Sequence, residues 1–352
     1  MPPTSLERVM TVISGGIPDR VPTDLHNFLP AAKAAGMKLS ECLRSGELMA
    51  ESQILAWRRF GHDMLLVENG TAALAEAMGC GVVYPDDTAP LAVAPALARL
   101  EDVDRLRPPD PGRDFPLTEV LKAVTILRRE FGDRVFVMGR ADQGPMSLAA
   151  MLRGHSRFFL DIGDEANAPL IGRLMDVCAE AGLRYAKALQ AAGAHGTSLG
   201  ELGSDTISPA MYRRFTVPRL KMFYGAMKEA RFPASLHQCG NTASVLDDMA
   251  ASGAAILELD PSTSLRAAKE TARGRAAVLG MVDPANVLER GTTEMVAAKA
   301  REAIVILAPG GGFILGPGCA LTPGTPEENV MALLEAAERF GRYNPDGSLA
   351  RS

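Results

Sequence analysis

The sequence predicts an α/β fold, a closed (β/α)8 TIM barrel with its active site at the carboxyl-terminal mouth of the strands. Short apolar segments alternate along the chain with amphipathic stretches of helical period, and this alternation calls for a parallel sheet with right-handed crossovers. Eight such segments within 352 residues match the repeat number and size of that barrel. An open, doubly wound sheet is the alternative, since it uses the same alternation. The predicted strands are residues 20–26, 63–68, 134–140, 196–201, 233–239, 254–260, 276–282 and 312–318.

Amphipathic helical stretches separate most of these strands, and two of them begin with a capping residue. Ser208 and Thr325 each precede a proline at a predicted helix start. The chain is expected to form one domain over residues 1–352, with an irregular, proline-rich excursion around 70–133. No glycine-rich dinucleotide or phosphate loop of useful quality is found. The clearest helical stretches are residues 39–60, 166–193, 208–230, 292–308 and 326–341.

The composition predicts a soluble globular protein and excludes several classes of partner. An apolar fraction of 47% with 22% charged residues indicates a sizeable core. The net charge of −5 gives no basic surface for nucleic acid, the apolar runs are too short to span a membrane, and the amino terminus lacks the pattern of a secretory signal. The five cysteines are scattered and odd in number, which predicts free thiols in a reducing cytoplasm. Three of them fall in or beside helical patterns and are expected to be packing residues: Cys42, Cys80 and Cys178.

Polar or metal-binding side chains stand at the carboxyl end of nearly every predicted strand. In a barrel these ends converge on one mouth, where catalytic residues gather. Burying so many polar groups without a partner or a function would be costly. These residues are His26, Glu68, Arg140, Asp142, Glu201, His237, Cys239, Asp260, Asp283 and Cys319.

His237 and Cys239 alternate along one strand end, in the stretch SLHQCGN, and the strand is expected to break at Gly240. Cys319 follows the last strand, in GPGCAL, where the glycines and the proline force a turn. The loops of these two strands are expected to face one another across the mouth, so that one ion bridges them. One imidazole and two thiolates suit Zn²⁺, and three protein ligands leave a fourth position open for a substrate. The alternative is a hydrogen-bonded core histidine beside two cysteines that pack as small apolar residues.

Long motifs of a known family run through the chain almost from end to end. The early ones are ERVMTVISGGIPDRVP, DQGPMSLAAMLRG and ELGSDTISPAMYRRFTVPRLKMF. The later ones are specific in both wording and order: SLHQCGNTASVLDDMAASGAAILELD, LGMVDPANVLERGTTEMV and GGGFILGPGCALTPGTPEENVMALLEAA. With these motifs the chain resembles the uroporphyrinogen decarboxylase superfamily, and within it the zinc-dependent corrinoid (methylcobamide) methyltransferases.

This resemblance implies a zinc centre, a mechanism and a partner. His237, Cys239 and Cys319 would be the zinc ligands, because H-x-C on the fifth strand and a cysteine after the eighth form the subgroup's pattern. The zinc would bind a thiol acceptor and lower its pKa, and the thiolate would attack the methyl group of methylcob(III)amide held by a separate corrinoid protein. The reverse transfer, from a zinc-bound methoxy or methylthio compound to Co(I), is also compatible with the resemblance.

Four further residues are candidates for the site, each with a structural alternative. Glu201 is a candidate catalytic carboxylate or fourth zinc ligand, or else a hydrogen-bonding group of the barrel rim. His26 is expected near the substrate or cofactor, or else as a structural histidine. Asp260 is a second candidate for the fourth zinc position, beside water or the substrate, and Asn241 and Asp260 are both candidates for cofactor binding. Both are also placed to cap the helices that follow them.

The corrinoid is expected on a partner protein. The stretch Asp24-Leu25-His26 partly matches the cobalamin signature D-x-H-x-x-G, but Leu29 stands where the signature has glycine. The stretch also lies on the first barrel strand, whereas the signature belongs to a Rossmann-like domain. We therefore expect no corrinoid domain in this chain. A homodimer is also possible from the sequence, but no feature identifies its interface.

Two other functions stand against the methyltransferase. True uroporphyrinogen decarboxylases carry an arginine-rich motif of the form RQAGRY after the first strand, which grips the substrate's carboxylates. Here residues 23–33 read TDLHNFLPAAK, with no arginine, so a highly anionic porphyrinogen would lose its main electrostatic anchor. The second alternative is a metal-free, barrel-shaped binding protein that kept the fold and lost the chemistry.

Overall fold

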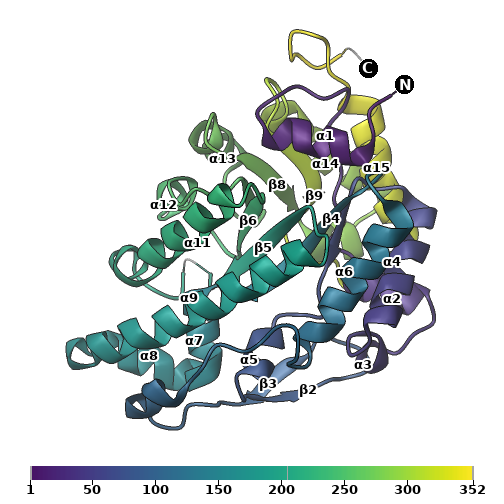
Figure 1. Cartoon of the computed structure of the whole chain (residues 1–352). Helices are drawn as coiled ribbons and strands as arrows, with labels where there is room; N and C mark the ends of the chain where they lie inside the picture. The colour runs from purple at the N-terminus through teal and green to yellow at the C-terminus, as the bar shows by residue number, and fades with distance from the viewer. Residues whose placement is uncertain (1, 204, 351–352) are drawn as a thin grey trace.

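A curled sheet of seven parallel strands forms the centre of the computed structural model, which describes residues 2–203 and 205–350 (Figure 1). The strands follow the order β1-β4-β5-β6-β7-β8-β9, so each pairs with its neighbour in the chain once a small hairpin is set aside. This agrees with the predicted parallel α/β fold. The strands are β1 Met64–Val67, β4 Phe136–Gln143, β5 Gly196–Glu201, β6 Ala234–Gln238, β7 Ile256–Leu259, β8 Ala277–Val282 and β9 Phe313–Pro317.

The first predicted strand, residues 20–26, is not a regular strand. It makes two isolated parallel bridges, from Thr23 to Leu315 of β9 and from Asp24 to Met64 of β1. The segment therefore lies between the two edge strands of the sheet. Pro22 has no N–H to donate, and His26 has a φ of 44°, which turns the chain away from an extended path. The predicted curled parallel α/β sheet is thus confirmed, but the closed eight-stranded barrel is not, because seven regular strands form and the eighth position has only two bridges.

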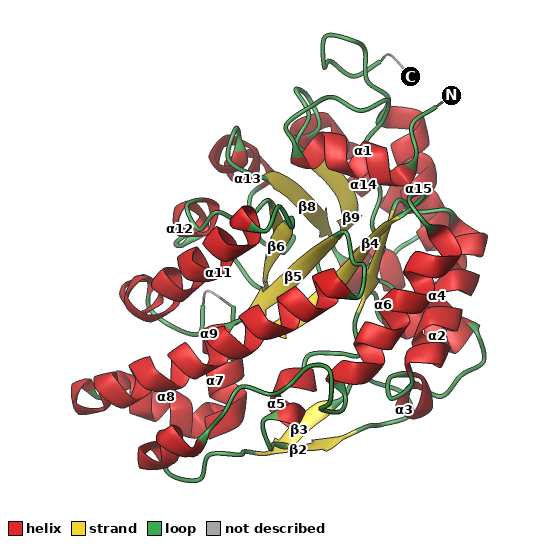
Figure 2. Ribbon diagram, in the orientation of Figure 1, coloured by secondary structure: helices red, strands yellow, loops and turns green. Residues whose placement is uncertain are grey.

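Helices surround the sheet on its outer side, as Figure 2 shows. The longer ones are α1 Ser5–Ile13, α4 Gly46–Phe60, α6 Leu117–Phe131, α7 Pro145–Arg153, α8 His155–Gly163, α9 Ala168–Ala191, α11 Val217–Glu229, α13 Leu265–Ala272, α14 Thr293–Leu307 and α15 Glu327–Phe340. The shorter ones are α2 Phe28–Ala34, α3 Leu39–Cys42, α5 Ala73–Ala77, α10 Pro209–Met211 and α12 Leu246–Ala250. Single turns of other helix types are η1 Leu100–Arg105, η2 Glu165–Asn167, η3 Tyr212–Thr216 and η4 Pro284–Glu289. None of the helices described is long and apolar enough to cross a membrane.

The predicted excursion around residues 70–133 contains more regular structure than expected. After β1 the chain forms α5 and then an antiparallel hairpin of β2 (Gly81–Val83) and β3 (Leu91–Ala94). It then passes through η1 and enters α6. This hairpin was not predicted from the sequence, because its two strands are only three and four residues long and show no clear alternation.

The barrel interior is apolar at one end and polar at the other. Met64, Phe136 and Ile256, each the first residue of its strand, pack with Val9 and Val12 of α1 in a separate interior cluster. Helix α1 therefore covers the amino ends of the strands. At the carboxyl half the inward side chains are buried but polar: Glu68, Arg140, Ser198, Ser235, His237 and Glu258. This division leaves the polar half as the place for a site.

A buried ion cluster fastens α1 to the amino ends of the strands. The Asp63 carboxylate lies 2.7 Å from Arg8 Nη1 and 2.6 Å from Arg20 Nη1, and its side chain is fully buried. The Ser5 hydroxyl donates a further hydrogen bond of 2.7 Å to the same carboxylate. Two cations therefore compensate one buried anion at the closed end of the barrel.

Candidate metal centre

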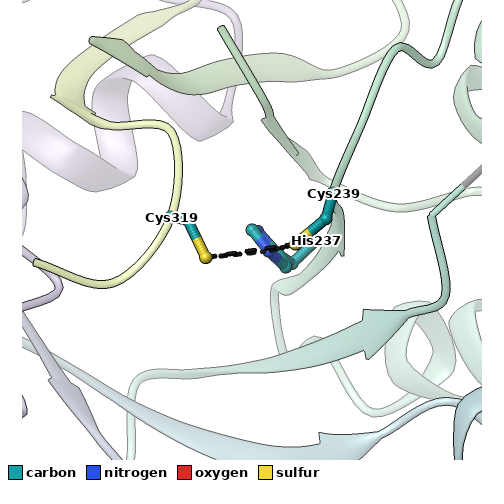
Figure 3. Close-up of side chains that lie close together, drawn as sticks. All are labelled: His237, Cys239 and Cys319. Carbon is teal, nitrogen blue, oxygen red and sulfur yellow. Dashed lines mark hydrogen bonds between the residues drawn. The ribbon is translucent and has the colours of Figure 1, made fainter. Parts of the chain in front are cut away.

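His237, Cys239 and Cys319 meet at the carboxyl ends of the strands, as predicted (Figure 3). His237 Nε2 lies 3.2 Å from Cys239 Sγ and 3.7 Å from Cys319 Sγ, and the two sulfurs are 4.0 Å apart. Their three donor atoms all lie within 4.8 Å of one another. This is the donor set of a tetrahedral zinc site with one position left for a further ligand, so the residues present fit Zn²⁺.

Local sequence explains how the three side chains converge. His237 points inward from β6, and Cys239 follows it by two residues, so alternation carries both to the same side. Gly240 has a φ of 77° and ends the strand directly behind them. Cys319 reaches the centre because Gly318 packs against Pro261 with no room for a Cβ atom. The two halves of the site are therefore built by strands that are 80 residues apart in the chain.

Glu258 of β7 lies on the other side of the His237 ring. Its Oε2 atom is 3.4 Å from His237 Nδ1, and the carboxylate is buried. The Ser198 hydroxyl donates a 2.9 Å hydrogen bond to Glu258 Oε1, and the Ser235 hydroxyl donates to the same oxygen. A carboxylate at Nδ1 favours the tautomer whose Nε2 lone pair faces the two sulfurs.

Sequence reasoning missed Glu258 and named Asp260 on the same strand instead. The signal was present in AILELD, where Ile256, Glu258 and Asp260 alternate on one side of the strand. Ile256 lies in the interior cluster, so Glu258 faces the interior as well. An acidic residue inside an otherwise apolar strand was therefore the available clue.

A second buried chain of ionic contacts runs from Glu258 to His26. Arg140 Nη1 lies 4.0 Å from Glu258 Oε2, and Arg140 Nε lies 3.0 Å from Glu68 Oε2. Glu68 Oε1 in turn lies 2.8 Å from His26 Nε2. The His26 and His237 rings stand perpendicular, with their centroids 6.4 Å apart. Two histidines at the mouth are thus linked through two carboxylates and one guanidinium.

These contacts shift several pKa values at the centre. Burial lowers the pKa of His237, but Cys319 and Glu258 outweigh it and raise that pKa to about 9. Burial raises the pKa of Glu258, but His237 and then Arg140 lower it to about 2. Contact with the Cys239 thiol, and then with His237, holds the pKa of Cys319 below its ordinary value. Without metal, the site therefore favours a protonated imidazole between the Glu258 carboxylate and the Cys319 thiolate, while contact with Cys319 raises the pKa of Cys239. Binding of a divalent cation would displace the protons of His237 and Cys239.

Glu201 lies away from the three ligands and caps a helix. Its carboxylate accepts hydrogen bonds from Met146 N at 3.2 Å, from Ser147 N at 3.1 Å and from Ser147 Oγ at 3.0 Å, at the start of α7. Burial raises its pKa to about 7, against these donors. Asp142 plays a similar part, because its Oδ2 accepts a 2.6 Å bond from Leu74 N in α5. A catalytic role for Glu201 stays a prediction.

The remaining candidates hold the loops around the mouth. Asp260 Oδ1 accepts hydrogen bonds from the backbone N–H of Ser262 at 2.8 Å and from its hydroxyl at 2.6 Å. Asn241 Oδ1 accepts one from Ala243 N at 3.0 Å. Both side chains therefore stabilise turns and do not cap helices, because the N-caps of α12 and α13 are Val245 and Ser264. Their roles toward a cofactor stay predictions.

The five cysteines divide into two groups by burial. Cys42, Cys80 and Cys178 are buried, whereas Cys239 and Cys319 are partly exposed. The first group matches the predicted packing residues. The two partly exposed thiols are the ones that face each other and His237, which the alternative of apolar packing does not explain.

A model of the family described as uroporphyrinogen decarboxylase (URO-D) matches residues 4–340. The chain belongs to this family. Within the URO-D family, it is 30% identical over 322 residues to the methylcobamide:CoM methyltransferase MtbA of Methanosarcina mazei, across 90% of this chain and 88% of that protein. It is 29% identical over 308 residues to the uroporphyrinogen decarboxylase of Carboxydothermus hydrogenoformans, across 85% of both. The resemblance read from the motifs is therefore confirmed.

Solved structures agree with this membership. A methyltransferase from Methanosarcina mazei superposes with a TM-score of 0.87 at 27% identity, over 95% of this chain and 98% of that one. A B12-independent methionine synthase from Shewanella sp. superposes with a TM-score of 0.55 at 17% identity, over 90% of this chain and 96% of that one, and supports the fold alone.

Proposed function

We propose that this URO-D family chain is a zinc-dependent methyltransferase that moves a methyl group between a corrinoid protein and a small molecule. The observation that carries the proposal is the N/S/S cluster of His237, Cys239 and Cys319 at the mouth of the strands. Relatives named as methylcobamide:CoM methyltransferases support it, since they align with almost the whole chain.

Some side chains of this centre would bind the metal, and others orient the metal-binding side chains. His237, Cys239 and Cys319 would hold the zinc ion and leave one position open. When bound, zinc supplies a Lewis acid that lowers the pKa of a thiol, so that the thiolate exists at neutral pH. Glu258 fixes the His237 ring from behind through Nδ1, and Ser198 and Ser235 keep that carboxylate in place.

The fixed position of the centre also restricts the reaction geometry. His237 lies in the buried strand β6, and Cys239 follows directly after that strand ends. A thiol bound beside them is thereby held in one orientation toward whatever covers the mouth, which favours an in-line attack on a methyl group. The same geometry serves the reverse direction, in which a methoxy or methylthio compound gives its methyl group to the corrinoid.

We propose that the corrinoid is carried by a separate protein. Asp24 and His26, the two residues that partly match a cobalamin signature, are buried beside β1 and β9. His26 is held by Glu68 and is therefore committed to an internal contact. The small-molecule partner is a thiol acceptor or a methoxy or methylthio donor.

Uroporphyrinogen decarboxylation is the second candidate, because a relative of that name aligns with most of the chain. The only arginine among the mouth residues predicted from the strand ends is Arg140, which lies 3.0 Å from Glu68 and is buried. A substrate with many carboxylates needs several free cations. This argues for the methyltransferase.

The test is methyl transfer from free methylcobalamin to a panel of thiols. The reaction is monitored by the loss of the methylcobalamin absorption spectrum. We expect turnover with at least one thiol, loss of turnover in Cys319→Ala, and little change in Cys178→Ala, where a buried packing cysteine is shortened. Uroporphyrinogen is offered in parallel. Decarboxylation of it without methyl transfer to any thiol would overturn the proposal in favour of the second candidate.

A further inference from the structure

The loop that carries Cys319 is held at two backbone points. Gly318 N donates a 2.8 Å hydrogen bond to Val282 O at the end of β8, and Leu321 N donates a 3.0 Å bond to His26 O. The first point belongs to the regular sheet. The second belongs to the segment that makes only two isolated bridges, so the position of this ligand depends on how firmly His26 is held.

His26 holds its carbonyl in place through an unusual backbone conformation. Its φ of 44° lies in the left-handed region, which residues other than glycine rarely adopt and which strains them. The imidazole is buried, and its Nε2 atom lies 2.8 Å from Glu68 Oε1. This is the polar contact of the imidazole, which otherwise lies beside the rings of Phe28 and His237.

Glu68 is itself fixed from the other side. Its Oε2 atom lies 3.0 Å from Nε of Arg140, and both side chains are only 3% exposed. Arg140 packs against Gly200, where a Cβ atom would collide with its guanidinium. The absence of a side chain at Gly200 thus leaves room for the guanidinium between Glu68 and the Glu258 carboxylate that faces His237.

We infer that Glu68, fixed by Arg140, is a positioning residue that holds the metal ligand Cys319 in place through His26. The inference rests on the proposed metal centre and adds a role that lies outside the ligand set. Without the Glu68 carboxylate, the left-handed turn at His26 relaxes, and Leu321 N loses its acceptor. Cys319 then moves away, whereas His237 and Cys239 stay on the rigid end of β6.

The test replaces Zn²⁺ by Co²⁺, whose thiolate charge-transfer absorption reports how many sulfurs bind the metal. We expect a two-thiolate tetrahedral spectrum for the wild type and a one-thiolate spectrum for Glu68→Ala, like that of Cys319→Ala. Zinc affinity, measured by competition with a chelator, should fall about 10- to 100-fold in Glu68→Ala, as is usual for supporting residues of metal sites. Glu68→Gln keeps an acceptor for His26 and should stay closer to the wild type.

A second pair of variants tests whether the left-handed backbone conformation of His26 positions Cys319. This test remains possible even if Glu68→Ala folds poorly. Glycine adopts the left-handed conformation freely, whereas valine is strongly disfavoured there. His26→Gly should therefore retain more of the two-thiolate spectrum than His26→Val. His62→Gln, a change of another buried histidine at the amino end of β1, is the control and should leave the spectrum unchanged.

The outcomes separate this inference from the proposed function. A two-thiolate spectrum and unchanged zinc affinity in Glu68→Ala would overturn the positioning role while leaving the metal centre intact. Equal losses in His62→Gln would also overturn it, because the effect would then be a general loss of stability. If the wild-type chain binds neither Co²⁺ nor Zn²⁺, the proposed function and the inference both fail.

Discussion

Glu258 and His237 face each other across 3.4 Å, with the carboxylate at Nδ1 and the two sulfurs at Nε2. The imidazole therefore has one nitrogen for a carboxylate and one for a metal. Such carboxylate–histidine pairs fix the tautomer and the ring orientation of a ligand. The pairing explains why an acidic residue is buried in the middle of β7.

Removing this carboxylate should weaken metal binding without removing a ligand. We predict that Glu258→Ala lowers zinc affinity about 10- to 100-fold, because the His237 ring loses its support. The measurement is chelator competition at constant pH. Glu270→Ala, at an exposed carboxylate of α13, is the control and should leave the affinity unchanged. An unchanged affinity in Glu258→Ala would show that the ring needs no carboxylate.

Metal loading should protect two of the five cysteines. Without metal, Cys239 and Cys319 should both react with a thiol reagent in the folded chain, because they are partly exposed. Cys319 should react first, because contact with Cys239 and His237 lowers its pKa, and Cys239 second, because contact with Cys319 raises its pKa. Burial raises the pKa values of Cys42, Cys80 and Cys178, which should react only on unfolding. Added Zn²⁺ should abolish both reactions. Reaction of more than two thiols in the folded chain would contradict this division.

Stability should fall in mild acid because of His62. The side chain is 1% exposed, and burial lowers its pKa to about 4. The unfolded chain, with a histidine pKa of about 6.5, binds the proton first, so the stabilising effect of neutral His62 is present above that pH and is lost as pH falls toward 4. The loss should be roughly 3 kcal/mol at most.

Urea unfolding of the wild type and His62→Gln at pH 7.5 and pH 5 measures this loss. The variant should lose less stability between the two pH values than the wild type does. His155→Gln, a change of an exposed histidine, should behave as the wild type. Equal pH dependence in the wild type and His62→Gln would remove His62 as the cause.

The ion cluster of Asp63, Arg8 and Arg20 at the amino ends of the strands should contribute to stability and not to metal binding. We predict that Asp63→Asn costs about 1.5–3 kcal/mol in the free energy of unfolding, since Arg8 and Arg20 lose their shared anion but keep Asp19 and Glu338 as partners. Urea unfolding measures this cost, and Asp133→Asn, at a carboxylate that is 80% exposed, is the control. Zinc stoichiometry of folded Asp63→Asn should match the wild type.

The sequence predicted the parts of the fold that follow from local periodicity. Seven of the eight predicted strands are regular, because apolar alternation and length identify strands in a parallel sheet. The segment 20–26 differs, because its course depends on the left-handed turn at His26, which no pattern of residue types announces. The hairpin within residues 70–133 was not predicted, because its strands are too short to show an alternating pattern.

The site was predictable only as far as its ligands. His237 and Cys239 are neighbours in sequence, and the family motif supplies Cys319, so all three could be named. Glu258 could be noticed as an acidic residue inside an apolar strand, but its contact with His237 follows from the register of β6 and β7, which the sequence does not show. Glu201 had the right residue type and the right strand end, but its side chain faces outward to α7.

The most direct test of the metal centre is the zinc content of the purified chain, with and without reconstitution. We predict about one zinc per wild-type chain and its loss in His237→Ala, because that variant keeps only two of the three ligands. No zinc in the wild type, even after reconstitution, would contradict the centre. His237, Cys239 and Cys319 would then be packing residues at the mouth of a barrel with an unassigned ligand.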